Sequence, residues 1–317
     1  MTEQSPAAEV FSVLSAGLLT TVQDLGRPGR RTAGVTPGGA MDQFAAMAAN
    51  RLAGNPPGSP LLECTVRGPV LAALRPCVVA VTGGDLGLHL GGAEAPLWEA
   101  FQVREGDALA FEGRRTGARA YLAVAGGLAA RRWLGSASTD LLVGKGGHEG
   151  RPLAEGDVLS AGPAPPWCDP RRGLGPRLRP AYAARPDLCA VPGPHLGHLD
   201  PRSRDALFGG PFRLGADANR VGYRLEGEAP LVMAGTGALL SFGVCAGCVQ
   251  VPASGRPILL MADHHTSGGY PVAACVARCS LPEAAQLVPG DTLSLKPVDP
   301  QEAQARWRLL LAALEEI

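Results

Sequence analysis

The chain is 317 residues long, and 46% of its residues are hydrophobic while 18% are charged. That composition provides enough apolar side chain for a packed core and excludes an intrinsically disordered protein. The 29 basic residues balance the 29 acidic ones, which excludes a global electrostatic attraction to nucleic acid or to a membrane surface.

Neither a targeting segment nor a membrane span is expected. The first residues, MTEQSPAAEV, lack a basic start followed by an apolar core, so we expect no signal peptide. No stretch of about 18 residues is apolar throughout, as a transmembrane helix requires. The eight cysteines of a chain this long then favour free thiols and a cytoplasmic location.

The first element with clear boundaries is a helix over residues 41–54, MDQFAAMAANRLAG. It is rich in alanine and methionine, carries Asp42 in its first turn, and stops at Gly54.

Short strands are expected between residues 78 and 160. The runs 78–84 and 119–127 are apolar or β-branched and end at glycine. The segments 105–111 and 155–160 each begin with a Gly-Asp turn followed by an alternating run. Such repeated turns are typical of β-barrels.

Residues 161–186 are rich in proline and arginine and read as a linker. We therefore predict an N-terminal domain over residues 1–168 and a C-terminal domain over residues 169–317.

The C-terminal half repeats the β pattern. Strands are predicted at residues 230–234, 249–252 and 256–263, and a third Gly-Asp turn opens the segment 289–295. A helix with charges along one face is predicted at 301–317. The alternation of strand and helix that indicates a doubly wound sheet is missing. Both halves are therefore predicted to be mainly β and barrel-like, with a few short helices.

The stretch TTVQDLGRPG places Gln23, Asp24 and Arg27 in a turn-rich run of a weakly charged sequence. It is either a polar strand end with an ordinary turn or one side of a binding site. Further along, Glu63 interrupts an apolar run and needs a partner if it is buried.

The segment GGAMD at residues 38–42 places two glycines before a helix N-terminus. Free backbone N–H groups there are suited to a carboxylate or phosphate. The alternative is that Asp42 is only a charge at the helix start and that the glycines only form a turn.

The run DANRVGYRLEG at 217–227 brings Asn219, Arg220, Tyr223 and Arg224 close together in sequence. Two guanidinium groups are suited to bidentate binding of a carboxylate or phosphate. Surface salt bridges are an equally weighted alternative.

A second polar cluster, MADHHTSGGYP, follows a buried-looking strand and contains Asp263, His264, His265, Thr266 and Tyr270. Polar groups gathered where a strand emerges are typical of barrel sites. Adjacent histidines on an extended chain point to opposite faces, which disfavours joint metal binding.

Cys245 and Cys248 form the motif CAGC, and Cys275 and Cys279 follow about 30 residues later. A structural zinc site is expected to use two CxxC pairs, and a thioredoxin-like site needs a βαβ unit that is missing here. Packed free cysteines without a metal are therefore the preferred interpretation.

Familiar nucleotide-binding and hydrolase motifs are missing. The sequence contains no GxxxxGK[ST] loop, no GxGxxG between a strand and a helix, and no GxSxG. It also has no biotin attachment site of the Met-Lys-Met type.

Nine runs in order, from about residue 18 to 295, resemble the biotin-dependent carboxyltransferase-like family. These are TTVQDLGRPGR, GVTPGGAMDQFAAMAANRLAGN, LLECTVRGP, VTGGD, AYLAVAGG, LGSASTD, ANRVGYRLEG, GCVQVPASGRPILLMADHHTSGGYP and LVPGD. The family includes the C subunit of 5-oxoprolinase, allophanate hydrolase subunit 2 and an antagonist of a kinase inhibitor. The resemblance implies two cyclophilin-like β-barrel domains.

The resemblance also favours a binding site over a mere turn at TTVQDLGRPG. The polar positions that it implies are Gln23, Asp24, Arg27, Asp42, Asn50, Asn219, Arg220, Tyr223, Gln250, Asp263, Thr266 and Tyr270. Of these, Asp24, Asp263 and Arg220 are expected to be catalytic and the others to bind substrate. The paired cysteines occupy positions that the family fills with other small residues, which again disfavours a metal.

The function implied is that of the C subunit in an ATP-dependent 5-oxoprolinase complex, which opens 5-oxo-L-proline to L-glutamate. Its expected partners are a homologous B subunit and an A subunit, and ATP is bound somewhere in the complex. One alternative is carboxyl transfer to urea or a related amide, with biotin carried on another protein. A third interpretation is a regulatory antagonist of a kinase inhibitor.

Overall fold

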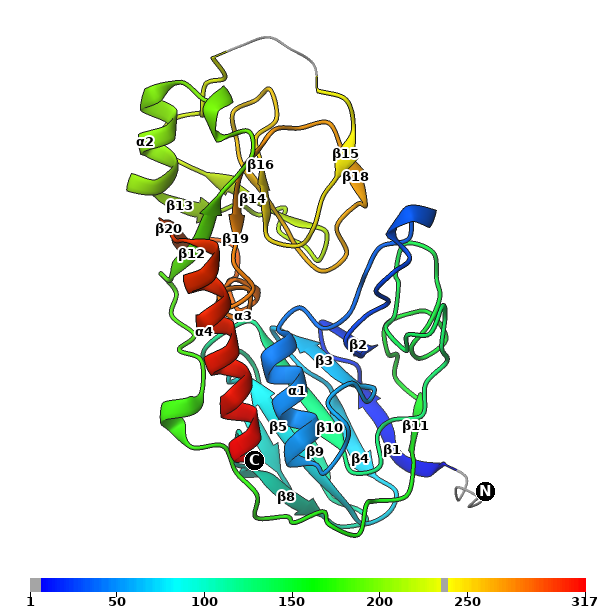
Figure 1. Cartoon of the computed structure of the whole chain (residues 1–317). Coiled ribbons are helices and arrows are strands. Elements are labelled where there is room, and N and C mark those ends of the chain that lie inside the picture. Colours follow the sequence, from blue (N-terminus) through cyan, green and yellow to red (C-terminus); the bar gives the residue numbers. More distant parts are fainter. Residues whose placement is uncertain (1–6, 235–238) are drawn as a thin grey trace. The chain divides into compact units, whose positions relative to one another are not determined.

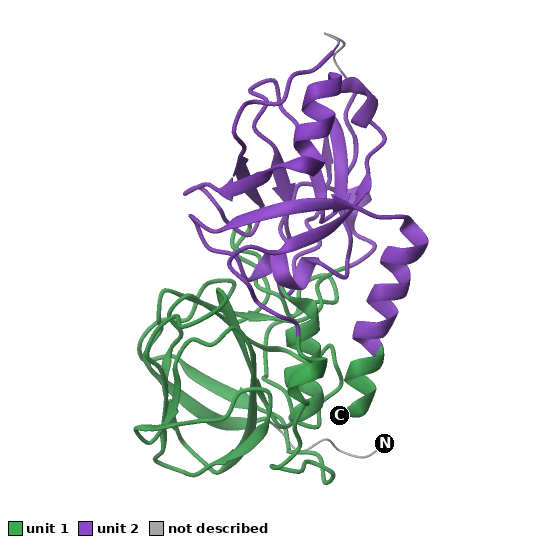
Figure 2. Cartoon of the chain, turned by 90° about the vertical axis from the view of Figure 1, so that its left-hand side faces the viewer, with its two compact units in different colours: residues 1–27, 42–179, 312–317 green, residues 28–41, 180–311 purple. Residues whose placement is uncertain are grey.

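The computed structural model describes residues 7–234 and 239–317 (Figure 1). The chain divides into two compact units that are discontinuous in sequence (Figure 2). Unit 1 comprises residues 1–27, 42–179 and 312–317, and unit 2 comprises residues 28–41 and 180–311. The predicted single domain boundary after residue 168 stays a prediction. The two units are not separated by one boundary along the chain, because residues 28–41 belong to unit 2 and residues 312–317 to unit 1.

Two antiparallel sheets form unit 1. One consists, in spatial order, of β11 (Val158–Ala161), β1 (Ala8–Ser15), β4 (Val70–Ala73), β9 (Ala108–Phe111), β6 (Leu88–Leu90) and β7 (Ala93–Glu94). The other consists of β2 (Leu19–Gln23), β3 (Leu61–Thr65), β10 (Arg119–Val124), β5 (Cys77–Gly83) and β8 (Ala100–Val103). Side chains of both sheets, among them Phe11, Leu109 and Leu122, share one apolar core.

Helix α1 (Gln43–Leu52) lies against β5 and β10 of the second sheet (Figure 1). Asp42 is its N-cap and accepts a hydrogen bond from the backbone N–H of Ala45. The buried face of the helix is largely alanine, which lets its backbone approach the sheet closely.

A closed barrel forms unit 2. Its strand order is β12 (Asp187–Pro192), β19 (Val272–Val276), β16 (Cys248–Gln250), β17 (Ile258–Leu260), β14 (Gly222–Glu226), β13 (Pro211–Leu214) and β20 (Thr292–Pro297). All pairs are antiparallel except β12 with β20, which is parallel. A separate two-stranded sheet joins β15 (Phe242–Gly243) to β18 (Ser267–Gly268).

The described chain contains three further α-helices and four 3₁₀ turns. They are α2 (Pro201–Gly209), α3 (Leu281–Ala285), α4 (Pro300–Ala313) and the 3₁₀ turns η1 (Arg31–Ala33), η2 (Pro176–Leu178), η3 (Leu196–His198) and η4 (Leu314–Glu316). Within the described ranges, no helix combines the length and the apolar character needed to cross a bilayer.

The three Gly-Asp turns share one local geometry. In each turn, the aspartate carboxylate accepts a hydrogen bond from the backbone N–H three residues earlier. The three donor–acceptor pairs are Arg104 with Asp107, Ala154 with Asp157 and Val288 with Asp291. The preceding glycines have φ values between +84° and +96°, a region in which side chains are disfavoured. The turns lead into β9, β11 and β20, as the sequence predicts.

The predicted mainly β fold with few helices is confirmed. The prediction of a strand at residues 230–234 is wrong. The backbone N–H of Val232 donates a hydrogen bond to the Ser203 hydroxyl, and its carbonyl accepts one from the backbone N–H of Asp200. These bonds to the start of α2 leave only an isolated bridge at Met233. Helix α2 was not predicted, although Asp200 caps it and Pro201 occupies its first turn.

Candidate functional site

Asp24 organises a loop in unit 1. It directly follows β2, and only 5% of its surface is exposed. One carboxylate oxygen accepts hydrogen bonds from the hydroxyls of Ser136 and Ser138, each at 2.6 Å. The other accepts the backbone N–H of Ala137 at 2.6 Å. Because both oxygens are already occupied, Asp24 holds the 136–138 loop against the end of β2, and its catalytic role stays a prediction.

Arg27 is buried beside the same loop. Its guanidinium donates to the carbonyl of Ser138, lies 3.5 Å from an oxygen of Asp140, and covers the Trp133 ring at 4.9 Å. This combination of charge, backbone and aromatic contacts fixes the side chain in place.

Gln23, the last residue of β2, is fully buried. Its amide nitrogen donates to the Thr21 hydroxyl at 3.0 Å and, at 3.4 Å, to the carbonyl of Thr139. Within the described part of the chain, its amide oxygen has no hydrogen-bond partner. Gln23, Asp24 and Arg27 of the TTVQDLGRPG segment are therefore buried together, and their role in a binding site stays a prediction.

A second polar chain lies beneath the start of α1. The Tyr121 hydroxyl donates to Glu63 at 2.9 Å and accepts the backbone N–H of Asp42 at 2.7 Å. Burial, and then the nearby carboxylates of Glu63 and Asp42, raise the pKa of Tyr121 well above its ordinary value, which keeps it a donor. With Ala45 also bonded to Asp42, this helix start favours the capping interpretation over an anion site.

Asn50 connects the end of α1 to its surroundings. Its amide nitrogen donates to the carbonyls of Pro57 and Ser59, and its oxygen accepts from Asn55. These bonds are structural, and substrate binding by Asn50 stays a prediction.

In unit 2, Arg220 and Asp263 form a bidentate ion pair. The two N–H···O distances are 2.8 and 3.0 Å, and Arg220 also donates to the carbonyl of Gly39 at 2.7 Å. The Arg220 side chain is nearly buried, while that of Asp263 is 17% exposed. This geometry fixes a carboxylate at the edge of the barrel while its charge is balanced.

Gln250 ends β16 and is fully buried, and its amide nitrogen has no hydrogen-bond partner among the described residues. A Cβ added at Gly268 would lie 2.9 Å from that nitrogen and 2.9 Å from Nε2 of His265. Glycine at position 268 therefore leaves room for the Gln250 amide nitrogen and Nε2 of His265 to lie next to the same backbone position. Thr266 is half-buried here and Tyr270 is half exposed.

His264, the neighbour of His265, is buried. Its Nδ1 lies 2.6 Å from the carbonyl oxygen of His265. Burial lowers its pKa, which favours the neutral imidazole.

Three other candidates lie apart from this group. Tyr223 is buried in the barrel core, Asn219 forms an exposed turn with Val221, and Arg224 is an exposed residue beside Asp217. The predicted substrate-binding roles of Tyr223 and Asn219 stay predictions. Arg224 fits the surface-pair alternative.

Four residues that complete these clusters were not among the residues predicted from the sequence: Ser136, Ser138, Asp140 and Trp133. The first three lie in the run LGSASTD, which was noticed only as part of the family resemblance. Their spatial role depends on contacts more than 100 residues apart in sequence.

A hollow of about 1200 Å³ in unit 2 lies beside α2, β13 and β14 and includes Asp200, Arg213 and Glu226 in its lining. It contains none of the predicted site residues. The residues best placed to share one metal ion within the described chain are instead Cys245, Cys248 and Cys275.

Comparisons with known proteins agree with the family resemblance. The family model for the carboxyltransferase domain, subdomains A and B, matches residues 33–297. The chain is 37% identical to the C subunit of 5-oxoprolinase from Escherichia coli strain K12, over 95% of this chain and 99% of that protein.

Two longer relatives contain a similar region. The urea amidolyase of Lachancea kluyveri is 30% identical over 97% of this chain, which spans 18% of that enzyme. The crystal structure of the K. lactis urea amidolyase superposes with a TM-score of 0.90 at 29% identity, over 98% of this chain and 20% of that one. The chain thus spans about a fifth of these two enzymes.

Proposed function

The chain belongs to the family of the carboxyltransferase domain, subdomains A and B, and on this basis we propose that it is the C subunit of a 5-oxoprolinase. The observation that carries the proposal is the match to the E. coli protein, which extends over nearly the full length of both chains. The reaction proposed is the ATP-dependent opening of 5-oxo-L-proline to L-glutamate.

The proposed activity requires a complex. The E. coli relative is named as one subunit of 5-oxoprolinase, which supports an assembly of several different chains. We assign a homologous B subunit and an A subunit as the partners and place ATP binding in the complex as a whole.

The chemistry begins with phosphorylation of the lactam oxygen of 5-oxoproline by ATP. The phosphoryl transfer releases ADP. Water then attacks the activated carbon and the C–N bond breaks, which leaves glutamate as an acyl phosphate. A second water hydrolyses this acyl phosphate to glutamate and phosphate. Gln250 is suited to donate its unpartnered amide N–H to a substrate oxygen, since a buried donor without a partner gains a full hydrogen bond on binding.

Asp263 has the complementary role. Its carboxylate, held by Arg220, is suited to position a proton or the attacking water. Arg220 fixes that carboxylate through two hydrogen bonds and is a positioning residue in this scheme.

A second function is favoured by one observation. The close superposition on the K. lactis urea amidolyase supports carboxyl transfer to urea or a related amide, with biotin supplied by another protein. This reaction requires biotin that has already been carboxylated, whereas ring opening of 5-oxoproline does not.

The test is ATP-dependent glutamate release from 5-oxoproline by this chain, by its partner proteins and by the reconstituted mixture. We expect release only in the mixture. Gln250→Met is expected to lower that rate, while Gln301→Met, which changes an exposed glutamine of α4 in the same way, serves as the matched control.

The outcome that overturns the proposal is a stably associated mixture that releases no glutamate. Carboxylation of urea from carboxybiotin by the same preparation would then establish the second function.

A further inference from the structure

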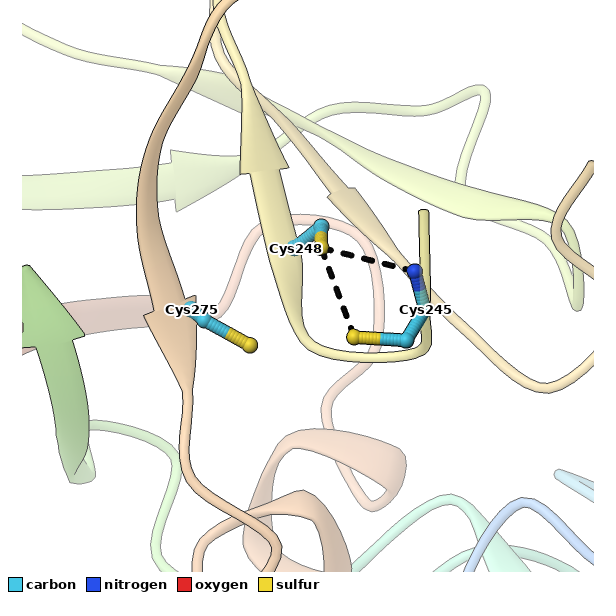
Figure 3. A group of neighbouring side chains, drawn as sticks. All are labelled: Cys245, Cys248 and Cys275. Atoms are coloured by element: carbon cyan, nitrogen blue, oxygen red, sulfur yellow. Dashed lines mark hydrogen bonds between the residues drawn. The ribbon is translucent and has the colours of Figure 1, made fainter. Parts of the chain in front are cut away.

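Three cysteines of unit 2 converge at the turn that precedes β16 (Figure 3). Cys245 and Cys248 belong to the CAGC turn, and Cys275 lies on β19. The sulfur atoms of Cys245 and Cys248 are 3.5 Å apart, and all three sulfurs lie within 4.8 Å of one another.

Backbone hydrogen bonds and strand pairing bring the three cysteines together. Cys248 and Cys275 are directly opposite each other in the antiparallel pair of β16 and β19, so their side chains share one face. The CAGC turn is closed by a hydrogen bond from Cys248 N–H to the Cys245 carbonyl. Gly247 has φ +92°, and a Cβ there would collide with the carbonyl oxygen of Val276.

The spacing of the sulfurs matches a tetrahedral metal site. Zinc–sulfur bonds of about 2.3 Å place two ligand sulfurs about 3.8 Å apart. The Cys245 and Cys248 sulfurs, 3.5 Å apart, are close to that value, and no two of the three sulfurs are more than 4.8 Å apart. Only small side-chain movements are therefore needed to bring three sulfurs onto one ion.

The cluster is also reachable from solvent. Cys245 is exposed and Cys275 is half-buried, while Cys248 is buried. A metal ion can therefore reach the cluster from the side of Cys245.

The remaining cysteines do not repeat this arrangement. Cys279, which the sequence paired with Cys275, lies instead in a small apolar cluster with Cys189. That pair offers two thiols, with Arg306 donating a hydrogen bond to the Cys189 sulfur.

We propose that Cys245, Cys248 and Cys275 bind one zinc ion as three thiolate ligands, leaving a fourth coordination position for water or another ligand. Each thiol releases its proton as the bond to zinc forms, and no electron is transferred. The proposal is independent of the 5-oxoprolinase activity.

The test uses the full chain, reduced and stripped of metal with a chelator. Zinc is titrated in competition with a chromophoric chelator, and cobalt(II) is used as a spectroscopic substitute. We expect one equivalent of zinc per chain and a thiolate-to-cobalt charge-transfer band.

Matched variants locate the site. Cys245→Ser and Cys275→Ser are expected to weaken zinc binding by at least about 100-fold, since even the loss of outer-shell support weakens metal binding about 10- to 100-fold. Cys77→Ser, which removes a half-buried thiol of unit 1, leaves the affinity unchanged. Because Cys245 is exposed, Cys245→Ser keeps the fold, which circular dichroism verifies.

The proposal is overturned if the reduced chain takes up no zinc or if Cys245→Ser binds it as tightly as the unchanged chain. Recovery of a Cys245–Cys248 disulfide, with no zinc uptake after its reduction, overturns it as well and identifies a dithiol pair instead.

Discussion

The two units contain parallel polar arrangements that differ in their arginine–aspartate contacts and in which glutamine atom lacks a hydrogen-bond partner among the described residues. Each has a buried arginine, Arg27 or Arg220, that donates both to a backbone carbonyl and to an aspartate. Each also has a buried glutamine at a strand end, Gln23 or Gln250. In unit 1 the aspartate contact is long, at 3.5 Å, and a tryptophan ring supports the arginine. In unit 2 the ion pair is bidentate and short.

The difference separates a structural cluster from a candidate binding group. Asp24 of unit 1 has both oxygens occupied by neighbouring donors, so it stabilises the loop that it holds. In unit 2, Asp263 is partly exposed, and the atom of Gln250 without a partner in the described part of the chain is a donor, whereas in Gln23 of unit 1 it is an acceptor. Buried polar groups without partners are unfavourable unless a ligand supplies one.

The largest effect is expected from Asp24→Ala. Removing this carboxylate leaves the buried donors of Ser136, Ala137 and Ser138 without their acceptor, and we expect a loss of about 3–5 kcal/mol in the free energy of unfolding. Urea denaturation measures this loss. Ser136→Ala, which removes one of the donors, should lower stability by about 1 kcal/mol. A loss below about 1 kcal/mol for Asp24→Ala would contradict its role in holding the loop.

Double-mutant cycles compare the two ion pairs directly. Arg220 with Asp263 is expected to show a coupling free energy of about 1–3 kcal/mol, because both hydrogen bonds are short and the arginine is buried. The Arg27 and Asp140 pair should couple more weakly, because its N–O distance of 3.5 Å is at the limit of a hydrogen bond. Alanine variants in each cycle, followed by denaturant unfolding, provide the values. Equal coupling in the two units would remove the distinction between them.

Gln250→Met separates binding from stability. The described part of the chain offers the Gln250 amide nitrogen no acceptor, so we expect the free energy of unfolding to change by less than about 1 kcal/mol. The rate of the reconstituted complex should fall about tenfold, the equivalent of one neutral hydrogen bond to substrate. The two measurements are thermal unfolding of the chain and glutamate release by the complex. Strong destabilisation with an unchanged rate would show that Gln250 is purely structural.

The smallest effect concerns pH and Asp157. The hydrogen bonds from Arg151 are the main cause that lowers the pKa of Asp157, followed by the bond from the backbone N–H of Ala154. A carboxyl whose folded pKa is depressed stabilises the protein above its unfolded pKa of about 3.9, and that contribution is lost as pH falls through the folded pKa. It amounts to about 1 kcal/mol, because Arg151 is partly exposed.

The variant Asp157→Asn tests this contribution. It should remove this part of the acid sensitivity when unfolding is measured between about pH 5 and pH 2. Asp107→Asn changes the equivalent turn, where no arginine among the described residues pairs with the aspartate. An acid response in Asp157→Asn as steep as that of the unchanged chain would contradict the assignment.

Local features could be predicted because their bonds join residues close in sequence. The Gly-Asp turns close over three residues, and Asp42 caps a helix three residues ahead. Glu63 within an apolar run indicated a buried partner, which is Tyr121. The strand predicted at 230–234 failed because the residues around α2 occupy its backbone groups instead.

By itself, the sequence determined the mainly β class, the turn chemistry and the family, since each depends on short-range bonding or on motifs in order. The tertiary structure decided which polar residues meet. Asp24 bonds to serines more than 110 residues away, and the register of β16 with β19 places Cys275, rather than Cys279, beside Cys245 and Cys248. Cys245 and Cys248 are close because they belong to one turn. Cys275 joins them only through the pairing of β16 with β19, since two residues opposite each other in a sheet can be any distance apart in the sequence.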